Sequence, residues 1–193
     1  HTYCYYFNRE LLENWQWTER YPGQPEILRY LKFCVKTLGL QQDIHLNERV
    51  VSGTWDDQSQ VWNISTASGH KCNARFLITA VGCLSSTNKP KIDGLTDFSG
   101  DIYHTSYWPH ETVKFDKKRV AVIGTGSSGI QAIPKIAKQA QKLFVLQRTP
   151  NYSVPARNRP LGSNFQSEFL KKIEFWRAKM LESRNGHPWV APD

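Results

Sequence analysis

The chain of 193 residues is long enough for one large domain or two small ones. Hydrophobic residues make up 39% and charged residues 22%, which permits a buried core and excludes general disorder. No apolar run approaches the roughly 20 residues that a membrane span requires, so we expect a cytoplasmic protein without a membrane partner. The net charge of +8 would suit nucleic acid, but Lys and Arg are scattered, so we expect no such partner.

The N-terminal half predicts one helix followed by three strands. Residues 25–38 favour a helix, because Pro25 suits its first turn, Gly39 suits its C-terminal cap, and apolar side chains recur on one face. Turn-like residues then separate three expected strands of a small antiparallel meander, which are 48–55, 60–67 and 71–82. Residues 76–81 are apolar enough to form a buried strand that enters a larger sheet.

The C-terminal half predicts a β-turn-α-β unit between two loops. The expected segments are a linker at 84–97, a strand at 119–123, a helix at 127–139, a strand at 143–147, a loop at 152–162 and a helix at 164–184. Pro134 lies inside the first of these helices and should kink or weaken it. In the second helix, Phe169, Ile173, Trp176 and Met180 fall on one apolar face.

A glycine-rich turn stands between the expected strand at 119–123 and the helix that follows it. Gly124, Gly126 and Gly129 fit the pattern G-x-G-x-x-G, in which the glycines permit a tight turn, close approach of a pyrophosphate, and close helix–strand packing. The start of a helix offers unpaired N–H groups and positive potential to an anion. The turn therefore predicts a dinucleotide site, whose candidate residues are Gly124, Thr125, Gly126, Ser127, Ser128 and Gly129.

The end of the second strand indicates which dinucleotide binds. NAD sites usually carry an Asp or Glu there that accepts a hydrogen bond from the ribose 2′-hydroxyl. This chain has Gln147-Arg148-Thr149 instead. Arginine cannot accept a hydrogen bond, but it pairs well with a phosphate. The sequence therefore favours NADPH over NADH.

An aromatic loop, FSGDIYHTSYWP at residues 98–109, lies upstream of the glycine turn. It fits F-x-G-x-x-x-H-x-x-x-W-P, and resembles the fingerprint of type I Baeyer–Villiger monooxygenases. Four more segments resemble that family in the same order: ENWQWTERYPGQPEILRYL, ITAVGCLSS, GTGSSGIQAIPKIA and LQRTPNYSVPARNRP. Related flavin monooxygenases that oxidise nitrogen or sulfur typically carry another residue at the position of Trp108. We refer to residues 98–109 as the fingerprint loop.

The resemblance implies an enzyme that uses FAD, NADPH and O2 to convert a ketone into an ester or lactone. It implies that Arg148 and Thr149 hold the 2′-phosphate, and that Gln131 belongs to the same cofactor-binding segment. It assigns His104 and Trp108 to a loop that couples nicotinamide binding to domain motion, rather than to acid–base chemistry. A strand-end turn near FAD is similar to Ala80, Val81 and Gly82, although the family often has Thr where Val81 stands.

The fold class that follows is α/β: a Rossmann-like NADP-binding domain with a parallel sheet, preceded by a partial FAD-domain segment with an antiparallel β-meander. Residues 1–90 are expected to form part of the FAD-binding domain, and residues 91–193 to hold the linker, the fingerprint loop and the NADP-binding domain. The chain opens at His1 and its sole methionine is Met180, so we expect an internal segment of a longer protein. The family's glycine-rich FAD motif and active-site arginine have no counterpart here, so we expect no ketone turnover by these residues alone.

Two other enzyme classes remain open at this point. An N- or S-oxidising flavin monooxygenase is disfavoured by Trp108-Pro109. A non-flavin NADP-dependent reductase would need a catalytic Tyr/Lys or His pair after the nucleotide fold, and none is evident. No metal site is expected, because the cysteines lack the spacing of metal ligands: Cys4, Cys34, Cys72 and Cys83.

Overall fold

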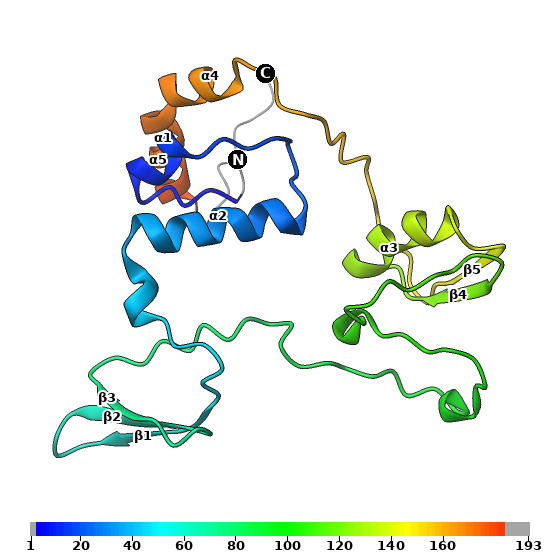
Figure 1. The fold of residues 1–193 in the computed structure, drawn as a ribbon, viewed down its shortest axis with the longest axis horizontal. Coiled ribbons are helices and arrows are strands. Elements are labelled where there is room, and N and C mark those ends of the chain that lie inside the picture. The colour runs from blue at the N-terminus through cyan, green and yellow to red at the C-terminus, as the bar shows by residue number, and fades with distance from the viewer. Residues whose placement is uncertain (1–2, 184–193) are drawn as a thin grey trace. The chain divides into compact units, whose positions relative to one another are not determined.

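The computed structural model describes residues 3–183 of the chain, and these form two compact units (Figure 1). The first unit takes in the described residues up to Leu77 and those from Ala156 onward, and the second is Ile78–Pro155. The first unit is therefore made of two separate stretches of the chain, one before and one after the second unit. The boundary expected at residue 90 separates an FAD-binding part from an NADP-binding part. These compact units do not test it, so it stays a prediction.

The helical part of the first unit is built from both ends of the chain. Its N-terminal helices are α1 (Arg9–Asn14) and α2 (Gln24–Thr37). The side chain of Asn8 caps α1 by accepting a hydrogen bond from the Leu11 amide at 3.0 Å. Pro25 lies in the first turn of α2, and Gly39 follows the helix with φ of +67°, in the left-handed region that glycine tolerates. The helix predicted at 25–38 is confirmed.

The C-terminal helices of this unit are α4 (Phe165–Lys171) and α5 (Ile173–Glu182). The single helix expected at 164–184 is wrong, because Lys172 departs from helical geometry at φ −110° and ψ 14° and divides it. Residue 184 lies outside the described residues. The predicted apolar face is confirmed, since Phe169 and Ile173 are buried and Trp176 and Met180 pack against the same cluster.

Two clusters of buried side chains form the core of the helical part. The first joins the two ends of the chain and contains Tyr6, Leu12, Phe169 and Ile173. The second lies between the N-terminal helices and contains Leu11, Trp17, Tyr30 and Cys34. The two most buried large side chains, Leu11 and Tyr30, are 0% and 1% exposed. Apolar burial of this extent is the main stabilising contribution to a small fold.

Polar contacts hold the returning chain beside residues 18–21. The Arg20 amide donates to the Arg159 carbonyl at 2.9 Å, and the Leu161 amide donates to the Thr18 carbonyl at 3.0 Å. Glu26 is buried, and its carboxylate accepts from the Thr18 amide at 2.8 Å and the Thr18 hydroxyl at 2.6 Å. A buried carboxylate without such donors would be costly, so these bonds fix the segment before α2.

The first unit also contains a three-stranded antiparallel sheet. Its strands, in spatial order, are β1 (Val50–Asp56), β2 (Val61–Thr66) and β3 (Lys71–Ala74). The predicted meander is confirmed, and its register places Trp55 opposite Trp62, with ring centroids 5.6 Å apart. The buried strand expected at residues 76–81 is wrong: Phe76 and Ile78 are 80% and 85% exposed. A strand requires a neighbour for its backbone groups, and no described segment pairs with this one.

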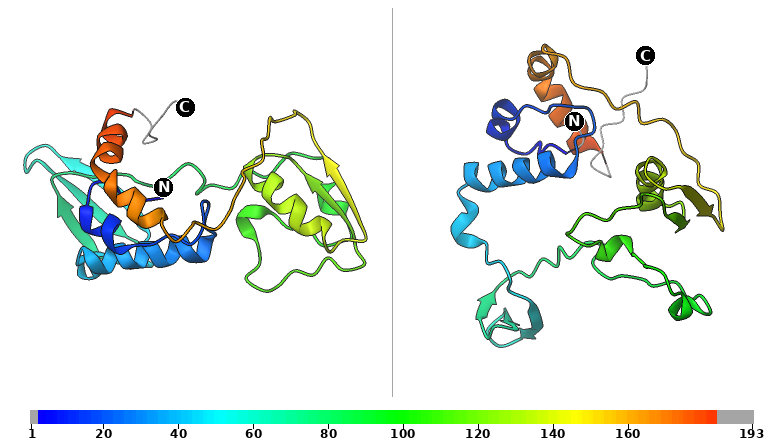
Figure 2. Two further views of the ribbon diagram at one scale, coloured as in Figure 1. Left: turned by 90° about the horizontal axis from the view of Figure 1, so that it is seen from above. Right: turned by 45° about the vertical axis from the view of Figure 1, so that its right-hand side comes forward.

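The second unit contains a β-α-β element, and Figure 2 shows its helix beside the strand pair. The elements are β4 (Arg119–Ile123), α3 (Ser127–Ala137) and β5 (Lys142–Leu146). The strands are parallel and in register from the pair Arg119–Lys142 to the pair Ile123–Leu146. The predicted order of strand, turn, helix and strand is confirmed within two residues at each boundary. The helix continues through Pro134.

The fold is thus α/β, with one antiparallel and one parallel sheet. Short 3-10 turns, η1 (Leu40–Asp43), η2 (Leu95–Asp97) and η3 (Thr105–Tyr107), interrupt the longer connections. Among residues 3–183, none of the helices combines the length and the apolar composition that crossing a membrane would take.

Candidate nucleotide-binding site

The glycine turn begins where β4 ends. The Gly124 amide donates to the Leu146 carbonyl at 2.9 Å, so the ladder between the two strands extends one residue into the turn. Gly124 then adopts φ of +100°, a conformation that residues with a Cβ rarely reach. The chain thereby leaves the carboxyl edge of the parallel pair and enters α3 within a few residues.

The other two glycines of the turn serve different purposes. A Cβ at Gly129 would lie 2.4 Å from the Gly124 carbonyl oxygen, so the fold itself requires glycine there. A Cβ at Gly126 would meet nothing within 4 Å, and the residue has an ordinary φ of −69°. Neither sterics nor backbone conformation in this chain demands glycine at that position. The open space over Gly126 is what a close-fitting ligand would need.

The start of α3 faces this open space without a side-chain cap. Gly126 occupies the N-cap position, and no side chain accepts from the amides of the first turn. The first intrahelical bond runs from the Ile130 amide to the Gly126 carbonyl at 2.9 Å. Uncapped amides at the positive end of a helix form a favourable environment for a phosphate group.

The segment after β5 lies against the turn. Gln147 donates from Nε2 to the Thr125 hydroxyl at 2.6 Å, and Asn151 donates from Nδ2 to the Thr125 carbonyl at 3.2 Å. Between them, Arg148 and Thr149 are exposed and make no hydrogen bond or ion pair with any described residue. Gln131 bonds within its own helix, from Nε2 to the Ser127 carbonyl at 2.8 Å. Asn151 was not among the site residues predicted from the sequence. Its position shortly after the end of β5, close to Arg148, could have indicated it.

The fingerprint loop belongs to the same unit as the glycine turn. His104 Nδ1 accepts from the Ser106 amide at 3.2 Å and so caps η3, which leaves Nε2 as the protonated nitrogen of the neutral ring. The ring of Trp108 lies 5.6 Å from that of Tyr103 and 6.2 Å from that of the buried Phe115. These contacts shape the loop, and none of them joins His104 or Trp108 to the glycine turn.

Two further contacts involve residues of the fingerprint loop. A Cβ on Gly100 would lie 2.6 Å from the ring of Phe98, so a larger residue at this position would require the exposed Phe98 ring to move. Lys118, just before β4, pairs with Asp101 at 3.0 Å. This contact connects the loop to the start of the strand that carries the glycine turn at its other end.

The three residues expected near FAD lie in irregular backbone. The Ala80 amide donates to the Ile78 carbonyl at 3.1 Å, Val81 is 72% exposed, and Gly82 has φ of +72°. No hydrogen bond joins them to the glycine turn in the part of the chain that the structure describes. No group of three or more potential metal ligands occurs among residues 3–183.

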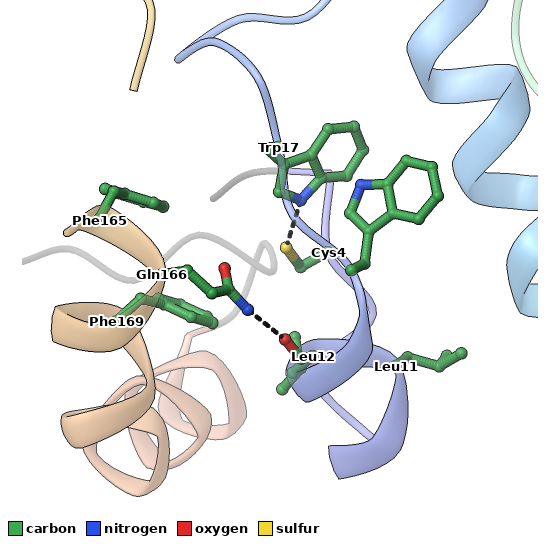
Figure 3. Close-up of a pocket in the computed structure, with 8 residues that line it drawn as sticks. Cys4, Leu11, Leu12, Trp17, Phe165, Gln166 and Phe169 are labelled. Atoms are coloured by element: carbon green, nitrogen blue, oxygen red, sulfur yellow. Dashed lines mark hydrogen bonds between the residues drawn. The ribbon is translucent and has the colours of Figure 1, made fainter. Parts of the chain in front are cut away.

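A small cavity lies elsewhere, inside the helical core. Figure 3 shows it between α1 and α4, lined by apolar and aromatic side chains. Trp17 Nε1 donates to Cys4 Sγ at 3.0 Å, and Gln166 Nε2 donates to the Leu12 carbonyl at 3.0 Å. Burial raises the pKa of the Cys4 thiol, which keeps it protonated. No charged side chain lines the cavity, and its volume of about 10 Å³ is far too small for a dinucleotide, so it is not the candidate site.

The parallel strand pair, its glycine turn and the uncapped helix are typical of the class of proteins that bind dinucleotides. The chain belongs to the pyridine nucleotide-disulphide oxidoreductase family, whose model matches residues 7–175.

Similar proteins of known name are oxygenases. The chain is 41% identical over 160 residues to the acetone monooxygenase (methyl acetate-forming) of Gordonia sp. strain TY-5, covering 83% of this chain and 30% of that protein. It is 40% identical over 172 residues to a phenazine N-monooxygenase of Lysobacter antibioticus, covering 89% and 32%. The solved structure of an oxidized steroid monooxygenase bound to NADP matches with a TM-score of 0.88 and 46% identity, over 98% of this chain and 36% of that one.

The predicted resemblance to Baeyer–Villiger monooxygenases is confirmed by these matches and by a relative that carries that name. The chain spans about a third of the length of the proteins it matches.

Proposed function

We propose that this chain supplies the NADPH site of an FAD- and NADPH-dependent monooxygenase that inserts one oxygen atom of O2 into ketones. The observation that carries the proposal is the open position at Gly126. There the chain itself has no need of glycine, and the uncapped start of α3 follows at once. The similarity to a steroid monooxygenase bound to NADP supports the same assignment.

Each part of the site has a task in this proposal. The amides at the start of α3 bind the diphosphate, and the bare backbone at Gly126 allows its close approach. The exposed Arg148 pairs with the 2′-phosphate, with the hydroxyl of Thr149 beside it. Bound NADPH supplies a hydride, and FAD supplies the oxygen chemistry. These residues bind and orient the coenzyme, and they take no covalent part.

The fingerprint loop and the turn at Ala80–Gly82 have less direct tasks. On the resemblance, we assign His104 and Trp108 to a loop whose conformation responds to the nicotinamide. Within this loop His104 caps η3 and Trp108 contacts Tyr103. We place Ala80, Val81 and Gly82 near FAD on the resemblance alone. Residues 1–90 would then belong to an FAD-binding domain and residues 91–193 to the linker and the NADP-binding domain.

The substrate class is the finer part of the proposal. One relative is named for acetone and another for nitrogen oxidation of phenazines, at 41% and 40% identity, so overall identity does not separate the two reactions. The Trp108-Pro109 pair of the fingerprint favours ketones. A panel of ketones, amines and thioethers should give ester or lactone as the main product of the protein that carries this chain. Oxidation of amines or thioethers without ketone turnover would contradict this assignment.

The coenzyme assignment is tested by Arg148→Gln in the protein that carries this chain. Removing one charge-assisted contact should weaken binding of NADPH by about ten- to a hundredfold and leave NADH unaffected. The matched control is Arg119→Gln, an exposed arginine at the opposite end of the same strand pair, which should change neither affinity. An unchanged ratio of NADPH to NADH affinity in Arg148→Gln would overturn the proposal.

We also expect that these 193 residues alone do not turn over ketones. Ester or lactone formation by the isolated chain, measured by gas chromatography after incubation with NADPH, FAD and a ketone, would contradict that expectation.

A further inference from the structure

Thr125, the residue between the first two glycines of the turn, is held from two sides. Gln147 donates to its hydroxyl at 2.6 Å and Asn151 donates to its carbonyl at 3.2 Å. The two bonds use different atoms of Thr125, so both can be present at the same time. Both donors come from the irregular segment that follows β5, at positions on either side of Arg148 and Thr149.

This segment has little else to fix its position. Residues 147–155 are exposed and lie outside any helix or strand. The guanidinium of Arg148 has no hydrogen bond or ion pair among residues 3–183 that would restrain it. A binding group is useful only when it is held close to its productive geometry, and loops hold groups less well than helices and strands do. Among the described residues, the two bonds to Thr125 are therefore the hydrogen bonds that restrain this segment.

We propose that Gln147 and Asn151 are positioning residues for coenzyme selection. They tie the segment that carries Arg148 to the turn that receives the diphosphate, and so keep the 2′-phosphate and diphosphate subsites at a fixed separation. The inference rests on the proposed function and deepens it. It applies only to a ligand that engages both subsites, so the contribution of the two amides appears with the 2′-phosphorylated coenzyme and not with its unphosphorylated counterpart.

The test is a double-mutant cycle in the protein that carries this chain. Gln147→Met keeps the length of the side chain and removes the donor, and Thr125→Val keeps its shape and removes the acceptor. We expect each single variant to weaken NADP+ binding by about three- to tenfold, the range that one net hydrogen bond supplies. Binding of NAD+ to Gln147→Met should not change. The double variant should be no weaker than either single variant, because one bond is lost in each case.

Three further variants complete the design. Thr125→Ser retains the hydroxyl and should restore NADP+ affinity to within twofold of the parent. Asn151→Leu removes the longer bond and should weaken NADP+ binding by less than Gln147→Met does. Gln139→Met, at an exposed glutamine just past the end of α3, is the matched control and should have no effect on either coenzyme.

The outcomes separate the inference from the proposed function. If Arg148→Gln removes the preference for NADP+ while Gln147→Met leaves it intact, the inference is overturned and the proposed function stands. Additive losses in the double variant, or an equal loss of NAD+ binding, would also overturn it. If Arg148→Gln itself leaves the preference unchanged, both fail together.

Discussion

The helical part of the first unit and the β-α-β element of the second differ most in how they are stabilised. Leu11 and Tyr30 are 0% and 1% exposed in the cluster between the N-terminal helices, and a second buried cluster joins Tyr6 and Leu12 to α4 and α5. In the second unit, Ile123 and Leu146 remain 61% and 51% exposed on a pair of parallel strands, a kind of sheet that is usually covered on both faces. The helical part therefore depends on burial, whereas the glycine turn depends on local backbone geometry.

The largest expected effect lies in the helical core. Tyr30→Ala should lower the free energy of unfolding of the helical part by about 3–5 kcal/mol, since it removes a fully buried aromatic ring. Phe144→Ala, at a 40% exposed aromatic residue of β5, is the counterpart in the second unit and should cost less than about 1 kcal/mol. Peptide-resolved hydrogen exchange across a urea series measures the two units separately. Equal losses in the free energy of unfolding of the two units would refute the proposed difference in how they are stabilised.

The next effect compares two glycines of the same turn. Gly129→Ala should destabilise the second unit by about 1–3 kcal/mol, because the new Cβ would lie 2.4 Å from a backbone oxygen. Gly126→Ala should cost less than about 1 kcal/mol, because its Cβ meets nothing within 4 Å. Binding should show the reverse: the Gly126 variant should fold and lose NADP+ affinity. Calorimetry of unfolding and titration with NADP+ measure both, and full affinity in a folded Gly126→Ala protein would contradict the role of the open position.

A smaller effect should appear at alkaline pH in the helical part. Burial raises the pKa of the Cys4 thiol above its usual value of 9.0, and burial likewise raises the pKa of the Tyr6 hydroxyl. Because the unfolded chain releases these protons first, stability is fully present below pH 9 and falls as the pH rises above it. Urea midpoints of the helical part between pH 7 and 11 should decrease. The decrease should be smaller in Cys4→Ala, which lacks one of the two groups. A urea midpoint that rises with pH would contradict the expected loss of stability.

The smallest effect concerns the ion pair between Lys118 and Asp101. Their side chains are 52% and 62% exposed, so water and salt screen the pair and we expect Lys118→Met to leave stability unchanged. The thermal midpoint should agree with that of the parent at both low and high salt. A clear loss at low salt would mean that the fingerprint loop relies on this contact more than its exposure indicates.

Local signals accounted for much of the fold. The helix at α2 was predictable because Pro25 and Gly39 mark its ends, and the meander because turn residues separate its strands. The glycine turn was predictable because G-x-G-x-x-G between a strand and a helix is a local pattern. The break at Lys172 was not, because the apolar face of α4 and α5 continues across it. Residues 76–81 were misjudged because apolar composition signals burial but does not supply a partner strand.

By itself, the sequence determined where the glycine turn lies, which of its residues could face a dinucleotide, and that arginine stands where NAD sites carry an acid. These features depend on residue type and on spacing within a few turns of the chain. The tertiary structure added the 2.4 Å approach that makes glycine necessary at position 129 and the open space at Gly126. It alone decided that Gln147 and Asn151 meet Thr125 from 22 and 26 residues away. Such contacts form when parallel strands bring their carboxyl ends together, and sequence spacing alone does not encode the distance across that edge.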